Sequence, residues 1–135
     1  MRRLALTAAL TLVLLAAVAA PALAGSPHFV DDKVTLSQDG ATLTVAFKEA
    51  GLGDEPQVHL VLSADAQCVN PGGNDPQAAN KQTVTAEGLF PVQNGRTEGS
   101  LSVTATFQPP CSPPMTVVYS SVVLTDVTSG ITVVL

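Results

Sequence analysis

The sequence predicts an all-β protein, a single antiparallel immunoglobulin-like β-sandwich of about seven short strands. Three observations support this fold class. Apolar and polar residues alternate with a period of two in several segments, which is typical of strands with one buried face. Turn-forming pairs, Asp39-Gly40 and Asn94-Gly95 among them, separate these segments. No segment carries the longer apolar period of an amphipathic helix. A small β-barrel is the alternative that the same pattern allows.

The first three predicted strands cover residues 34–37, 42–48 and 57–64. In each of them every second residue is apolar, so one face of the strand is expected to be buried. The loop of residues 49–56 separates the second strand from the third. The residues expected to face inward are Val34 and Leu36, then Leu43, Val45 and Phe47, then Val58, Leu60 and Leu62.

The last four predicted strands cover residues 82–86, 100–107, 115–125 and 131–135. The pattern over residues 82–86 predicts only a weak strand. The apolar residues 89–92 after it contain Pro91, which favours a short segment at the edge of a sheet. The second has the cleanest alternation in the chain and makes Phe107 a core residue, like Phe47. The third is apolar on both faces around Val118, which favours a central strand.

Residues 1–24 have the organisation of a secretory signal peptide. Arg2 and Arg3 form a basic start, residues 4–20 are apolar, and Ala22-Leu23-Ala24 is a cleavage motif of small residues. A membrane anchor is the alternative, but no basic cluster follows the apolar stretch. We therefore predict that residues 25–135 form the β-sandwich domain and that this domain is secreted to the extracellular side.

The predicted mature domain is acidic. Removing Arg2 and Arg3 leaves 4 of the 6 basic residues against 11 acidic ones, a net charge of about −7. A surface of this sign repels phosphate groups, which argues against nucleic acid as a partner. We also expect no membrane insertion of the mature chain. The expected partner is an extracellular protein or a cell-envelope component, bound by a monomer.

The two cysteines, Cys68 and Cys111, both lie in the predicted mature domain. In an oxidising compartment an even number of cysteines indicates a disulfide, so we predict this pair. In an immunoglobulin-like order the third and sixth strands are neighbours, and the bond would then join two loops at one pole. Two free thiols or a metal pair are the alternatives, and the lack of a neighbouring histidine makes a poor zinc site.

The loop of residues 68–81, CVNPGGNDPQAANK, is the first candidate for a binding site, together with the proline-rich residues 109–114. Loops at one end of a rigid sandwich commonly carry recognition. With Asp65, this loop also offers several oxygens of the kind that Ca²⁺ prefers. Asn and Asp are equally the usual turn formers, so we predict no metal or cofactor and keep a small-ligand or Ca²⁺ carrier as an alternative. The binding candidates are Asn70, Asn74, Asp75, Asn80 and Lys81.

Catalysis is not expected, and we predict that the protein is not an enzyme. His59 lies on a predicted strand and has no serine or cysteine nucleophile in a recognisable motif. The adjacent carboxylates at 31–32 and 54–55 are interpreted as solvated charges. The proline-flanked Cys111 leaves a secreted hydrolase inhibitor as an alternative function, because a stiff, disulfide-anchored loop is preorganised for binding.

Several motifs together resemble a group of small secreted bacterial proteins described as hypothetical or exported. They are AFKEAGLG at residues 46–53, the NPGGN and AANK pieces of the loop 68–81, Asn94-Gly95 before a GSL strand, and the proline-flanked Cys111. The resemblance implies secretion and a common fold, and it brings no known activity or site residue. At the level of fold, size and charge, the chain is also similar to the neocarzinostatin class, which has two disulfides where this chain has cysteines for one.

Overall fold

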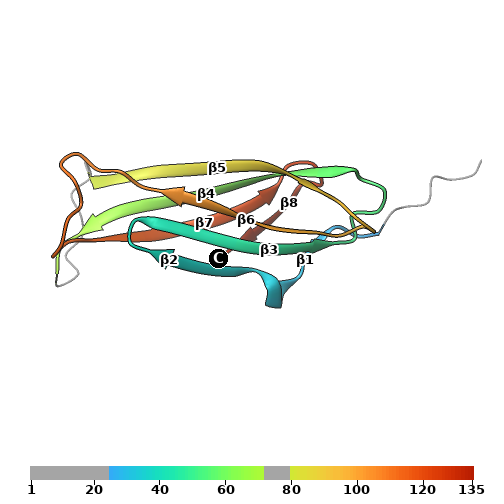
Figure 1. Cartoon of the computed structure of the whole chain (residues 1–135), viewed down its shortest axis with the longest axis horizontal. Helices are drawn as coiled ribbons and strands as arrows, with labels where there is room; N and C mark the ends of the chain where they lie inside the picture. The colour runs from blue at the N-terminus through green and yellow to red at the C-terminus, as the bar shows by residue number, and fades with distance from the viewer. Residues whose placement is uncertain (1–24, 72–79) are drawn as a thin grey trace, which may run out of the picture.

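The computed structural model describes residues 25–71 and 80–135, which form two antiparallel sheets packed face to face (Figure 1). The predicted β-sandwich is thereby confirmed. The predicted signal peptide, residues 1–24, lies outside the described residues. So do residues 72–79, which include the binding candidates Asn74 and Asp75.

The first sheet, sheet A, is built around β3 (Thr42–Ala50). Strand β6 (Thr97–Thr104) pairs with one edge of β3. The other edge pairs with β1 (His28–Phe29) near its end and with β2 (Thr35–Asp39) near its start. A single 3-10 turn, η1 (Asp31–Lys33), links β1 to β2.

The second sheet, sheet B, has the order β5-β4-β7-β8. Its strands are β5 (Lys81–Pro91), β4 (Gln57–Val69), β7 (Thr116–Asp126) and β8 (Ile131–Val134). Strands β4 and β7 are the predicted third and sixth strands, and they are neighbours as an immunoglobulin-like order requires. The fourth strand, β5, pairs with β4 and so belongs to the same sheet.

Several strands differ in length from their predictions. Strand β4 continues to Val69 and therefore contains Cys68. Strand β5 is continuous where two pieces were expected, because it lies at the edge of sheet B, where Pro91 needs no partner for its missing N–H. Strand β6 ends at Thr104, three residues before its predicted end. Two residues of the polar lead-in form the additional strand β1.

The core lies between the sheets and consists of the inward residues of β3, β4, β6 and β7. Phe47 is buried as predicted and meets Phe90 edge to face, with 4.9 Å between the ring centroids. The prediction that Phe107 is a core residue is wrong, because β6 ends before it and it remains half-exposed. Leu36 is 46% exposed, since β2 is an edge strand that sheet B only partly covers.

A β-bulge in β7 changes which residues of this strand face the core. Its pairing with β4 shifts between Ser63 and Asp65, and Ser121 on β7 has a positive φ of 50°. Before the bulge Tyr119 packs against the core, and after it Val122 and Leu124 are buried. The bulge therefore moves the inward phase from odd to even residue numbers.

The strand ends meet at two poles of the sandwich (Figure 1). The disulfide pole, on the left of the view, contains the end of β4, the start of β5, the β2–β3 hairpin and the β6–β7 connector. The carboxyl pole, on the right, contains the β3–β4, β5–β6 and β7–β8 connections. The predicted Asn94-Gly95 turn makes the β5–β6 connection, with positive φ at both residues.

Candidate functional site

The disulfide pole is held by the predicted bond between Cys68 and Cys111, which is confirmed. The S–S distance is 2.01 Å and the two Cα atoms are 5.7 Å apart. Cys68 faces inward near the end of β4 and is 6% exposed, while Cys111 lies in the β6–β7 connector. The bond therefore fixes the connector to sheet B at one pole and does not cross the core.

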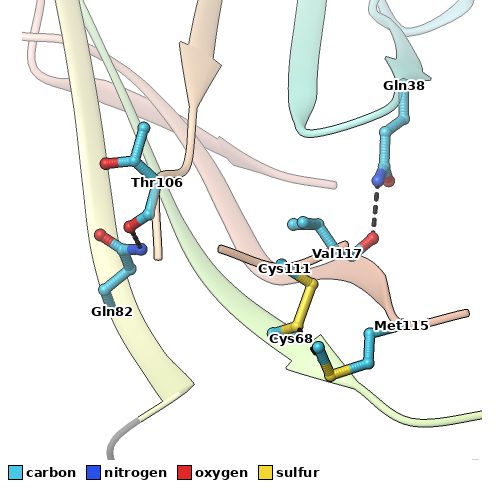
Figure 2. The surroundings of a disulfide bond; sticks show 7 residues. All are labelled: Gln38, Cys68, Gln82, Thr106, Cys111, Met115 and Val117. Atoms are coloured by element: carbon cyan, nitrogen blue, oxygen red, sulfur yellow. Dashed lines mark hydrogen bonds between the residues drawn. A yellow bond between two sulfur atoms is a disulfide. The ribbon is translucent and has the colours of Figure 1, made fainter. Parts of the chain in front are cut away.

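Hydrogen bonds around the disulfide tie the neighbouring segments together (Figure 2). Gln38 Nε2 on β2 donates to the carbonyl oxygen of Val117 on β7, at 2.8 Å. Gln82 Nε2 on β5 donates to the carbonyl oxygen of Thr106 at 2.6 Å. Met115 Sδ lies 3.9 Å from Cys68 Sγ. These contacts reach the pole from four different strands and the connector.

Tyr119 adds a second clamp beneath the same pole. Its side chain points inward from β7, and its hydroxyl donates to the carbonyl oxygen of Ala41 in the β2–β3 turn. The same hydroxyl accepts the N–H of Ala105 at 3.1 Å, just after β6. Burial raises the pKa of this hydroxyl above its usual value. One side chain of sheet B thus fastens two segments of sheet A.

A hollow of about 310 Å³ opens beside the disulfide. Its lining includes Ala41, Phe107, Pro110, Cys111 and Val117, which are mostly apolar. The half-exposed Phe107 ring is available at this hollow because the strand ended before it. The arrangement offers an open, mostly apolar hollow beside a covalent cross-link, which suits contact with an apolar side chain of a partner.

The binding candidates of the loop 68–81 have different surroundings. Asn70 is exposed just after β4, Asn80 is half-buried, and Lys81 is exposed at the start of β5. Lys81 lies opposite Gln67 in the sheet, so the two ends of the loop are side by side. The described candidates therefore share the disulfide pole with the proline-rich connector.

Asp65, which was considered as an oxygen donor to Ca²⁺, lies on the outer face of sheet B. Its carboxylate accepts a hydrogen bond from Thr83 Oγ1 at 2.8 Å, and four residues of strand separate it from Asn70. Within residues 25–71 and 80–135, no three His, Cys, Asp or Glu side chains come close enough to hold a metal ion.

His59 also lies on the outer face of sheet B. Its Nε2 is 2.9 Å from Glu87 Oε2 on the neighbouring strand, with 37% and 68% of the two side chains exposed. No hydroxyl or thiol nucleophile is hydrogen-bonded to this imidazole in the described part of the chain. The pair has the features of a surface ion pair between adjacent strands.

The carboxyl pole contains a pair of buried acids that the sequence analysis missed. Glu49 on β3 and Asp126 on β7 are both 0% exposed. Burial raises the pKa of Glu49 to about 8, and the Asp126 carboxyl adds to this rise through hydrogen bonding and charge repulsion. Both Glu49 oxygens and Oδ2 of Asp126 lack a hydrogen-bond partner of standard geometry among the described residues.

A sequence signal for one of the two acids was present. Glu49 continues the inward series Leu43, Val45 and Phe47, and a glutamate in that phase marks a buried carboxyl if the strand continues. Asp126 has no such signal, because the bulge at Ser121 is what turns it inward. The acids 54–55, interpreted as solvated, are exposed in the β3–β4 loop.

Comparison with protein-family models, with curated proteins and with solved structures finds no match for this chain. None of the helical turns in the described part of the chain is long and apolar enough to cross a membrane. The sandwich fold and the geometry of its two poles are therefore the basis for any functional assignment.

Proposed function

We propose that this chain is a secreted, non-enzymatic binding protein whose partner, an extracellular protein or a cell-envelope component, binds at the disulfide pole. The contact surface comprises the loop of residues 68–81 and the connector of residues 109–114. Secretion is supported by the signal-peptide pattern of residues 1–24 and by the disulfide, since such bonds persist in oxidising compartments.

The observation that carries this proposal is the covalent fixation of an exposed, proline-rich connector beside an apolar hollow. Pro109, Pro110, Pro113 and Pro114 are exposed, and the bond to Cys68 limits their freedom. A surface whose loops are ordered before binding loses less conformational entropy when it associates. A half-exposed apolar ring such as Phe107 is a common anchor in protein interfaces.

The test compares substitutions at the two poles. The oxidised protein is immobilised and exposed to the secreted proteins and solubilised envelope of the producing cells, and captured proteins are identified by mass spectrometry. A partner of the disulfide pole is retained by the wild type and by Asp54→Asn, and is lost with Phe107→Ser or Asn70→Ala. A partner that all four proteins retain equally contradicts the proposal.

A secreted inhibitor of a hydrolase is the second candidate function. The connector contains a tight turn in which the N–H of Met115 donates to the carbonyl oxygen of Ser112 at 2.9 Å. Ser112 is exposed beside the disulfide, in the position of a preorganised inhibitory loop. A panel of extracellular proteases and glycosidases tests this function, and an unchanged rate for every enzyme in molar excess of the protein rules it out.

A further inference from the structure

Two carboxyl groups from opposite sheets are buried together at the carboxyl pole. Glu49 comes from the end of β3 in sheet A, and Asp126 comes from the end of β7 in sheet B. Neither residue has any exposed surface. Two buried carboxylates side by side repel each other and lose much of their hydration, so such a pair is stable when a proton is bound between them.

The two acids use their oxygen atoms differently. Asp126 Oδ1 accepts the N–H of Thr128 at 2.8 Å and that of Ser129 at 3.1 Å, and so it holds the β7–β8 turn. Asp126 Oδ2 and both Glu49 oxygens have no partner among the described residues. Three buried oxygens without donors leave a protonated Glu49 as the donor that the site requires.

In the described part of the chain no positive charge pairs with either acid. The only ion pair among residues 25–71 and 80–135 is His59–Glu87, on the outer face of sheet B. Burial raises the pKa of Glu49, and the Asp126 carboxyl adds to the rise. Strand β8 has no titratable side chain, and the charged groups on the other elements around the pole are at the surface: His28, Asp31, Asp32, Lys33, Lys48, Asp54, Glu55, Arg96 and Glu98.

We infer that Glu49 and Asp126 share one proton and act as a pH-sensitive latch between the two sheets at the carboxyl pole. With the proton in place, the Glu49 hydroxyl donates to the Asp126 carboxylate and joins β3 to β7. When base removes this proton to solvent, two buried negative charges face each other without a donor. Repulsion then separates the sheets at this pole and weakens the β7–β8 turn that Asp126 holds.

The direction of the pH effect follows from proton linkage. The folded chain binds the Glu49 proton up to a pH of about 8, whereas an ordinary glutamate in the unfolded chain releases it near 4.5. Between these values the folded state holds one proton more than the unfolded state. The unfolding equilibrium constant then rises about tenfold for each pH unit in this window, and the rise ends above it.

The first test is denaturant unfolding of the oxidised protein from pH 5 to pH 9. We expect the wild-type equilibrium constant to rise by about 400-fold between pH 5 and pH 8, and the rise to be absent in Glu49→Gln. Glu98→Gln, an exposed glutamate on β6, is the matched control and keeps the wild-type slope. Equal slopes for the wild type and Glu49→Gln overturn the inference. The two histidines are present in all three proteins, so the comparison removes their contribution.

A second test needs no substitution at the pair, in case Glu49→Gln does not fold. The side-chain carboxyl carbon of Glu49 is followed by ¹³C NMR as a function of pH in the wild type. A midpoint near 8 supports the shared proton, and a midpoint near the ordinary value of 4.5 refutes it.

Hydrogen exchange at single amides tests whether the carboxyl pole opens when the pair loses its proton. The amides of Thr128 and Ser129 should lose hydrogen-exchange protection above pH 8, after correction for intrinsic exchange, whereas that of Ala105 at the other pole should keep it. If protection at Thr128 and Ser129 is the same at pH 6 and pH 9, the carboxyl pair titrates without opening the pole, and the latch is refuted.

Discussion

The two poles of the sandwich differ in what joins their sheets and segments. At the disulfide pole a covalent bond and the Tyr119 hydroxyl hold the connector, the β2–β3 turn and the end of β6. At the carboxyl pole two buried acids face each other, and no cation pairs with them in the described part of the chain. We therefore expect one pole to depend on the redox state of the surroundings and the other to depend on their pH. The covalent cross-link and the Tyr119 hydrogen bonds therefore lie at the pole proposed for binding.

The largest expected effect is removal of the disulfide. The bond joins residues separated by 43 positions, and closing a loop of this length in the unfolded chain is worth about 4 kcal/mol. Replacement by Cys68→Ala with Cys111→Ser should lower the free energy of unfolding by this amount in urea at pH 6. A loss below about 1 kcal/mol would mean that the hydrogen bonds alone hold this pole.

The next effect is expected to be a gain in stability. At pH 9, Glu49→Gln removes one of two buried negative charges and should raise the free energy of unfolding by roughly 3 kcal/mol over the wild type. At pH 5, where the wild-type Glu49 is protonated, the same substitution should give no gain. Urea unfolding at both pH values measures this, and a destabilised variant at pH 9 would contradict the shared proton.

The Tyr119 clamp should have a smaller effect that is independent of pH between 5 and 8. Tyr119→Phe removes the hydroxyl and its two hydrogen bonds, while the N–H of Ala105 still donates to the carbonyl oxygen of Ala41 at 3.2 Å. The expected loss is about 1 kcal/mol, the net contribution of a typical hydrogen bond, because neither backbone group is left unpaired. Ser120→Ala, at the exposed neighbouring position, is the control and should change thermal stability little.

The smallest effect is expected for the exposed pair on sheet B. His59→Gln breaks the contact with Glu87, but both side chains are in contact with solvent. The loss should stay below about 0.5 kcal/mol. Thermal unfolding at pH 6 checks this value. A larger loss would show that charges on the outer face matter as much as those at the poles.

Much of the fold was predictable because it follows from local alternation. The inward residues of β3 and β4 were assigned from period-two patterns, and the cysteine pair followed from the even number of cysteines and agreed with the predicted strand order. The half-exposed Phe107 was not predictable, because β6 ends where its partner β3 turns at Ala41, and the alternation itself continues. The burial of Asp126 was not predictable either, because it depends on the bulge at Ser121, and no periodic pattern reveals a bulge.

The candidate site was predictable only in part. Asn70 and Lys81 lie at the two ends of the loop 68–81, which meet because β4 and β5 are paired, and their role in binding stays a prediction. Glu49 was overlooked because its charge suggested a loop, although its position in the alternation of β3 is inward. Burial of an acid depends on a partner from the other sheet, and that contact lies far away in the sequence.

The most direct test of the comparison is whether the two poles act independently. Leu60, which pairs with Asp126, and Cys68 are eight residues apart on β4, a distance of roughly 26 Å. At this separation the contributions of the two poles to the free energy of unfolding should add. The free energy of unfolding is measured at pH 5 and pH 9 for the oxidised wild type and for the Cys68→Ala, Cys111→Ser protein. We expect the loss between the two pH values to agree within about 0.5 kcal/mol in the two proteins. A loss that disappears when the disulfide is removed would contradict a separate, proton-dependent pole.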